Sequence, residues 1–160
     1  MMLLSIGWIV GKTFQSRVGF TFIAFGLWDI FYYIWLLIFI GWPWSIIEPD
    51  LLFLIPLPWW GPLLPPILIA LMMLIGGIFA VIKMEKNRTL HIDAWFWIFL
   101  ITGILIILYT FMVDALIAIP TDISTLSSLK SSQFKWPVYL LGFGLDMTAL
   151  WRMIVGSRGN

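Results

Sequence analysis

Length, composition and charge already define the class of protein. Of the 160 residues, 62% are hydrophobic and 11% are charged, whereas soluble domains average about 45–50% apolar and about 25% charged residues. We therefore predict an integral membrane protein, built as one all-α transmembrane bundle without a separate soluble domain and without a nucleic-acid partner. The absence of cysteine excludes disulfides, thiolate metal sites and cysteine nucleophiles.

The N-terminal half is expected to contain two full spans. Residues 1–10 are apolar but too short to cross a bilayer, which takes about 20 helical residues, so they form an interfacial helix or the end of a span whose beginning is missing. The first full span is 18–40, ended by a Gly-Trp-Pro sequence. Segment 44–64 is apolar but broken by prolines, and we predict that it is re-entrant or lies on the outer surface. The second span, 65–82, begins at two prolines, which suit a first helical turn.

The C-terminal half is expected to contain two more spans, 92–119 and 137–155, separated by the exposed, serine-rich loop 121–136. Basic residues at the span ends divide unevenly, with seven on one side and two on the other. The larger group is Lys12, Arg17, Lys83, Lys86, Arg88, Arg152 and Arg158, and the smaller is Lys130 and Lys135. By the positive-inside rule the larger group is cytoplasmic, so segment 44–64 and the serine-rich loop share the outer face.

Asp29 lies near the middle of the first span, where an ionisable group costs at least about 2.5 kcal/mol. Tyr32 and Tyr33 follow three and four residues later, so all three share a helical face and the phenols can hydrogen-bond the carboxylate. We expect Asp29 to be buried and bonded to a tyrosine or to another helix, in a structural role or as a carrier of a proton, ion or ligand. Asp146, midway along the last span, could meet Asp29 at similar depth and complete a candidate intramembrane polar site.

Two further charged residues are expected near the cytoplasmic end of the bundle. Asp93 lies at the inner start of the third span, where an interfacial or helix-capping role is predicted. Arg152 is close to the inner end of the last span, and we expect its side chain to extend to the interface instead of pairing.

His91 is the only histidine. This excludes bis-histidine haem within one chain and argues against a His-rich metal site. The sequence also contains no glycine-rich phosphate loop and no two-carboxylate hydrolase pattern. We therefore predict no metal site, no cofactor and no catalytic residues, so that the chain is not an enzyme.

Four tryptophans, Trp42, Trp44, Trp59 and Trp60, gather in the predicted outer segment. Such residues are typical of an aromatic belt at the headgroup level. The alternative is an outer aromatic groove that binds a quinone, carotenoid, lipid or neighbouring subunit. Small-residue pairs, Gly76 with Ala80 and Gly144 with Thr148, predict close helix packing within the bundle or against a partner.

Three patterns follow one another in the first half of the chain: Trp28-Asp-x-Phe-Tyr-Tyr, Gly41-Trp-Pro and Phe53-Leu-Ile-Pro-x-Pro-Trp. Together they resemble a group of uncharacterised small bacterial multi-spanning membrane proteins, over about residues 18–66. Pro49 stands where that group is expected to have tryptophan. The resemblance implies a bacterial source, and with it a location in the inner (cytoplasmic) membrane. It also implies a complete helix ahead of the short segment 1–10, and it carries no activity.

These observations favour a non-catalytic small membrane subunit that packs against larger partners, with an electron-transfer complex as one setting. The reason is that the chain has much apolar surface, almost no soluble part and no complete chemical site. One alternative is a small proton- or ion-coupled carrier centred on Asp29. Another is binding of a quinone or lipid at the outer aromatic groove.

The predicted orientation can be tested with introduced cysteines, because the chain has none of its own. A cysteine at Ser127 should react with a membrane-impermeant maleimide on intact cells, whereas a cysteine at Lys86 should react only after the membrane is opened. Labelling of position 86 with protection of position 127 would reverse the orientation.

Overall fold

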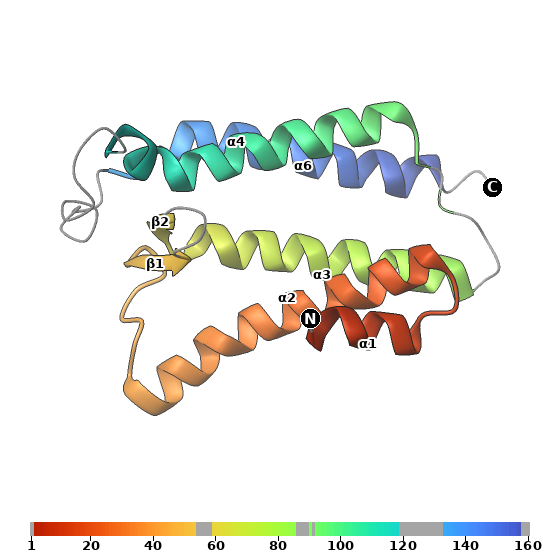
Figure 1. The fold of residues 1–160 in the computed structure, drawn as a ribbon, viewed down its shortest axis with the longest axis horizontal. Helices are drawn as coiled ribbons and strands as arrows, with labels where there is room; N and C mark the ends of the chain where they lie inside the picture. The colour runs from red at the N-terminus through yellow and green to blue at the C-terminus, as the bar shows by residue number, and fades with distance from the viewer. Residues whose placement is uncertain (1, 54–58, 86–89, 91, 119–132, 158–160) are drawn as a thin grey trace.

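The computed structural model describes residues 2–53, 59–85, 90, 92–118 and 133–157. Helices dominate this part of the chain (Figure 1): α1 (Met2–Val10), α2 (Phe14–Ile40), α3 (Leu64–Glu85), α4 (Ala94–Ala118) and α6 (Trp136–Gly156). The last four are long and apolar enough to cross a membrane, which confirms the prediction of a multi-pass helical bundle. The predictions for His91, Lys86, Arg88 and most of the serine-rich loop lie outside the described residues.

The four long helices form two hairpins, because α2 packs mainly on α3 and α4 packs mainly on α6. Helix α3 lies between α2 and the α4–α6 pair (Figure 1). The turn between α1 and α2 and the end of α6 lie at one end of the bundle, here named the inner end. Strands β1 and β2 and the start of α6 lie at the opposite, outer end. Helix α1 runs back along the inner half of α2.

Helix α2 begins four residues earlier than predicted because Thr13 caps it. The Thr13 hydroxyl accepts a hydrogen bond from the Ser16 backbone N–H (3.2 Å), and the Ser16 hydroxyl accepts one from the Thr13 backbone N–H (3.0 Å). Arg17 fits within the helix because its Nε donates to the Gly11 carbonyl (3.0 Å) and its guanidinium lies over the Trp8 ring. The helix ends as predicted, at Gly41, whose φ of 67° is the left-handed conformation that glycine adopts readily.

Helix α3 includes Pro65 and Pro66 in its first turn, as predicted, but it continues to Glu85 instead of ending at residue 82. The prediction stopped at the first charge, Lys83. That residue is in fact buried in the last turn, where its ammonium group donates to the carbonyl of Ser157 at the end of α6. Helices α4 and α6 agree with the predicted spans to within two residues at each end.

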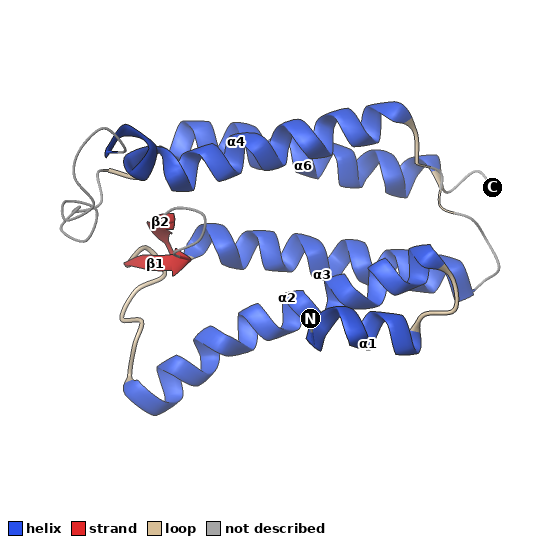
Figure 2. Ribbon diagram, in the orientation of Figure 1, coloured by secondary structure: helices blue, strands red, loops and turns tan. Residues whose placement is uncertain are grey.

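Segment 44–64 contains an antiparallel hairpin of β1 (Pro49–Phe53) and β2 (Trp59–Pro62) (Figure 2), which the all-α prediction did not include. The prolines at the two strand ends face each other in the register, where a missing N–H costs little. The backbone N–H of Leu64 donates to the Ile46 carbonyl (2.9 Å) and ties the segment to the start of α3. Whether the segment enters the membrane stays a prediction.

Within each of the two helical hairpins, the paired helices approach each other most closely at glycine. A Cβ atom on Gly77 of α3 would lie 2.6 Å from the Gly19 carbonyl of α2, and one on Gly26 would lie 2.6 Å from the Ala70 carbonyl. In the other hairpin, a Cβ on Gly103 of α4 would lie 2.7 Å from the Gly142 carbonyl of α6. These distances are too short for any side chain, so glycine sets the helix separation.

The small-residue pairs expected from the sequence have different outcomes. Gly76 faces Leu150 of α6, and Ala80 is buried next to it, so this pair does pack within the bundle. Gly144 has no atom within 4 Å of a built Cβ, and Thr148 is exposed and donates to the Gly144 carbonyl (2.8 Å). The second pair therefore has no packing role inside the described chain.

The close approach of α4 and α6 predicts that Gly103→Ala is destabilising. The added methyl group collides with the Gly142 carbonyl and the Asp146 side chain, and such overpacking costs about 1–3 kcal/mol. The free energy of unfolding by SDS in mixed micelles measures this. Gly144→Ala is the matched control, since its methyl group meets nothing and alanine is the better helix former. Equal stability of the two variants would contradict the tight contact.

Candidate functional site

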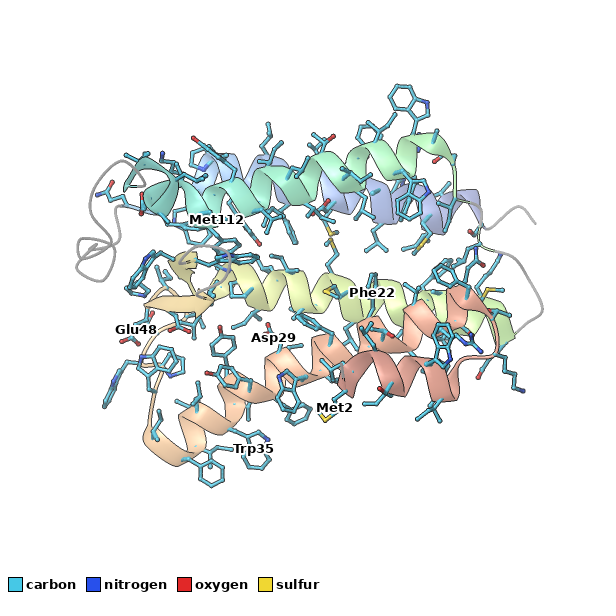
Figure 3. The ribbon with its side chains drawn as sticks, in the orientation of Figure 1. Met2, Phe22, Asp29, Trp35, Glu48 and Met112 are labelled. Atoms are coloured by element: carbon cyan, nitrogen blue, oxygen red, sulfur yellow. The ribbon has the colours of Figure 1, made fainter. Side chains whose placement is uncertain are left out.

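Asp29 lies on the side of α2 that faces α3 (Figure 3) and is half-buried. Its neighbour Tyr33 is only 7% exposed, and the Tyr33 hydroxyl is within electrostatic range of Asp29 and of Asp50 on β1. Tyr32 is 48% exposed and meets the Tyr33 ring edge-on. No hydrogen bond to Asp29 is formed by any residue that the structure describes. The expected bond to a tyrosine or to another helix is therefore missing from this part of the chain.

Asp146 is the more deeply buried carboxyl group. Its side chain is 2% exposed and lies against Gly103, at the point where α4 and α6 approach most closely. Its Oδ1 atom has no hydrogen-bond partner among the described residues. A glycine at position 103 is required here, because any side chain would occupy the space of the carboxyl group.

The two carboxylates do not form one site. Asp29 is on α2, whose packing partner is α3, whereas Asp146 faces α4. Helix α3 separates the two positions (Figure 1). The predicted polar site of Asp29, Tyr32, Tyr33 and Asp146 is therefore wrong as a single cluster, because α6 presents Asp146 to α4 and not toward the first hairpin.

Aromatic residues do gather at the outer end, but as a packed core. Its centre is Tyr139, which is fully buried and donates a hydrogen bond to the Pro65 carbonyl (3.0 Å). Around it lie Phe111 of α4 and further rings from β2, from α6 and from the loop before α6: Trp59, Phe134, Trp136 and Phe143. This cluster joins α6 to the start of α3 and to β2.

The predicted outer groove of Trp42, Trp44, Trp59 and Trp60 is not assembled in the structure. Trp59 stacks on Phe111 and belongs to the packed core. Trp44 is 86% exposed and makes no ring contact with another described residue. Because Trp59 is packed against the bundle and Trp44 is exposed, the four rings do not line one groove together.

A groove occurs elsewhere, between the middle parts of α3 and α6. Its volume is about 370 Å³, and its lining is almost wholly apolar. Leu68 and Met72 form one wall, and Phe143 and Met147 form the other. No pattern in the sequence predicts this groove, because it depends on which faces of two distant helices meet.

At the inner end, polar contacts join elements that are far apart in the chain. Asp93 forms an ion pair with Arg152 and accepts a hydrogen bond from the Phe96 N–H (2.9 Å). The capping role predicted for Asp93 is thus present, whereas the prediction that Arg152 stays unpaired is wrong. The ion pair with Arg152, and then the Phe96 N–H, hold the pKa of the Asp93 carboxyl below its ordinary value.

Within the described residues, no group of three or more His, Cys, Asp or Glu side chains could hold a metal ion. Comparisons with known proteins add no assignment: no family model matches the chain, and no match is found among curated proteins or solved structures. The functional interpretation therefore depends on the sequence and the geometry of this molecule.

The lowered pKa of Asp93 predicts an acid-dependent contribution to stability. A carboxyl group whose pKa is lowered by folding stabilises the folded state above its ordinary pKa of about 3.9, and this stabilisation is lost as the pH falls through the lowered value. The melting temperature of Asp93→Asn in detergent should therefore be below that of the native chain at pH 7, and the difference should disappear as the pH falls through the lowered pKa.

Arg152→Gln is the matched variant for the same measurement. It should give the same pH-dependent difference, and the double variant should add little, since both substitutions break one pair. High salt should also reduce the difference, because the pair is partly exposed. A difference that is constant from pH 2 to pH 7 would contradict the ion pair.

Proposed function

We propose that this chain is a small, non-catalytic membrane subunit that packs against other membrane chains. In this proposal the inner end faces the cytoplasm of a bacterium, in keeping with the basic residues there and with the family resemblance. An electron-transfer complex is one setting that fits a chain with so little soluble structure.

The observation that carries the proposal is the exposed aromatic surface on α2. Trp28 lies at the middle of this helix and is 56% exposed, and Trp35, two turns further on, is equally uncovered. Tryptophan in membrane proteins concentrates at the water interface and not at mid-depth. It is also enriched at protein–protein contacts, where it contributes much of the binding energy. A protein neighbour on this surface explains its position better than lipid does.

The shape of the bundle supports the same interpretation. Helix α2 has 27 residues, about 40 Å at 1.5 Å per residue, and it leans away from α3 toward the outer end (Figure 1). Only Ser16, Gly19, Gly26 and Tyr33 of this helix are buried. Although α2 packs closely on α3, most of its side chains are not buried within the chain and are available to surrounding lipid or protein.

Two alternatives are kept, each with its own supporting observation. A proton- or ion-coupled carrier centred on Asp29 is supported by the half-buried carboxylate, but such a path cannot use Asp146 as its next step, since α3 separates them. Lipid or quinone binding is supported by the apolar groove of about 370 Å³ between α3 and α6, a volume in the range of small-molecule sites.

Gentle extraction of the tagged chain into native nanodiscs tests the proposal. We expect other membrane proteins to co-purify at fixed stoichiometry. A particle that contains this chain alone would contradict the subunit role. Ion-dependent flux in liposomes, lost in Asp29→Asn, would then establish the carrier, and a lipid or quinone displaced by Met72→Trp would establish the groove as its site.

A further inference from the structure

Asp29 belongs to a regularly spaced stripe along one flank of α2. The other members are Phe22, Phe25, Tyr32 and Leu36, with alternating spacings of three and four residues. This spacing places all five side chains on one side of a helix, in the pattern with which a second helix packs. Phe22, Phe25 and Tyr32 are each more than a third exposed. The stripe is thus an uncovered helix-packing surface with one carboxylate at its centre.

The carboxylate at that position needs a cation or hydrogen-bond donors. An ionisable side chain at mid-membrane depth is expensive and is found paired. Asp29 is 15 residues from the start of α2, about 22 Å along the helix, and no described residue hydrogen-bonds to it. Its position on the edge of the α2–α3 contact leaves it open toward the Tyr32 side of the helix.

The described part of this chain has no basic group at the depth of Asp29. Arg17 and Lys83 lie at the inner end and bond to Gly11 and Ser157, Arg152 pairs with Asp93 there, and Lys135 lies at the outer end. A second copy of the chain in the same orientation would offer the same groups at the same depths. Charge complementarity therefore favours a different chain as the source of the cation.

We infer that the stripe around Asp29 is the docking surface for a transmembrane helix of a partner subunit, which places a lysine or arginine against the Asp29 carboxylate. The inference rests on the proposed subunit role and names the chemistry of one contact. Tyr32 lies one turn from Asp29 on the exposed side of the helix. Its hydroxyl is therefore positioned to donate a hydrogen bond within the ion pair that Asp29 forms with the partner. Ion pairs at this depth fix both the register and the choice of partner.

Photo-crosslinking in native membranes tests the inference. A benzoylphenylalanine at Tyr32 should crosslink to a membrane helix of another protein, and the crosslinked peptide should carry Lys or Arg within one helical turn. The matched position is Ile34, which is comparably exposed but lies on the opposite side of α2. Crosslinks from position 34 should not reach that helix.

Variants at Asp29 separate a docking role from a structural one. Asp29→Leu should lower the crosslink yield from position 32 roughly three- to tenfold, Asp29→Asn should lower it less, and Asp29→Glu should retain it. The stability of the isolated chain should not fall in Asp29→Leu, since no bond within the described chain is lost. Asp29→Lys combined with Asp in place of the partner's basic residue should restore the crosslink.

The inference fails if position 32 crosslinks only to lipid or to a second copy of this chain, or to a helix without a basic residue. It also fails if Asp29→Leu leaves the crosslink yield unchanged. When other subunits still co-purify in those cases, the subunit role stands and only the docking surface is wrong. When no other chain co-purifies at all, both proposals fail.

Discussion

The arrangement of this protein depends on the close approach of helix backbones at glycine. In a bilayer the apolar side chains of separate helices gain little by leaving lipid for one another, so association depends on tight packing and polar contacts. Gly19 with Gly77 sets the separation of α2 and α3, and Gly103 with Gly142 sets that of α4 and α6. Each hairpin therefore has a fixed internal distance. The contact between the two helical hairpins, formed by α3 and α6, is less extensive than the contact within either hairpin. It relies on other interactions.

Those other interactions lie at the two ends of the bundle. At the outer end, Tyr139 bonds to the Pro65 carbonyl within an aromatic core. At the inner end, Lys83 of α3 bonds to the last turn of α6 at Ser157. Between these ends the facing helices leave an apolar groove. The two helical hairpins are thus joined by polar and aromatic contacts at their ends and separated by an apolar groove between them.

The spans were predictable from sequence because membrane thickness fixes their length, and the Gly-Trp-Pro sequence located the end of α2. The β-hairpin was not, since Pro49 and Pro62 indicated only broken helix, and their cross-strand register is a long-range property. The charge of Lys83 predicts a span boundary, because a charged group favours water. Its partner is a carbonyl 74 residues away, which no local pattern reveals.

Glycine contacts were equally hard to predict. The sequence emphasised pairs spaced by four residues, Gly76 with Ala80 and Gly144 with Thr148. Among the four long helices, the closest approaches instead use Gly26, Gly77 and Gly103, which each meet a backbone carbonyl of another helix. A single tight contact needs only one residue without a side chain, whereas the spaced pair is the signature of a longer parallel seam. The composition of an apolar helix cannot distinguish a single tight contact from a longer line of close packing.

For Asp29 and Asp146, the position along the helix and the direction in which the carboxyl group points are set by different factors. Each lies near the middle of its helix, as the sequence predicted. Direction follows from packing: Gly103 leaves space for the Asp146 carboxyl between two helices, whereas Asp29 sits beside Gly26 on the edge of a contact. The first carboxyl is enclosed by its own chain, and the second opens onto surface that only another molecule can cover. For this reason the two identical side chains are not expected to share a role, and the exposed one is the better guide to a partner.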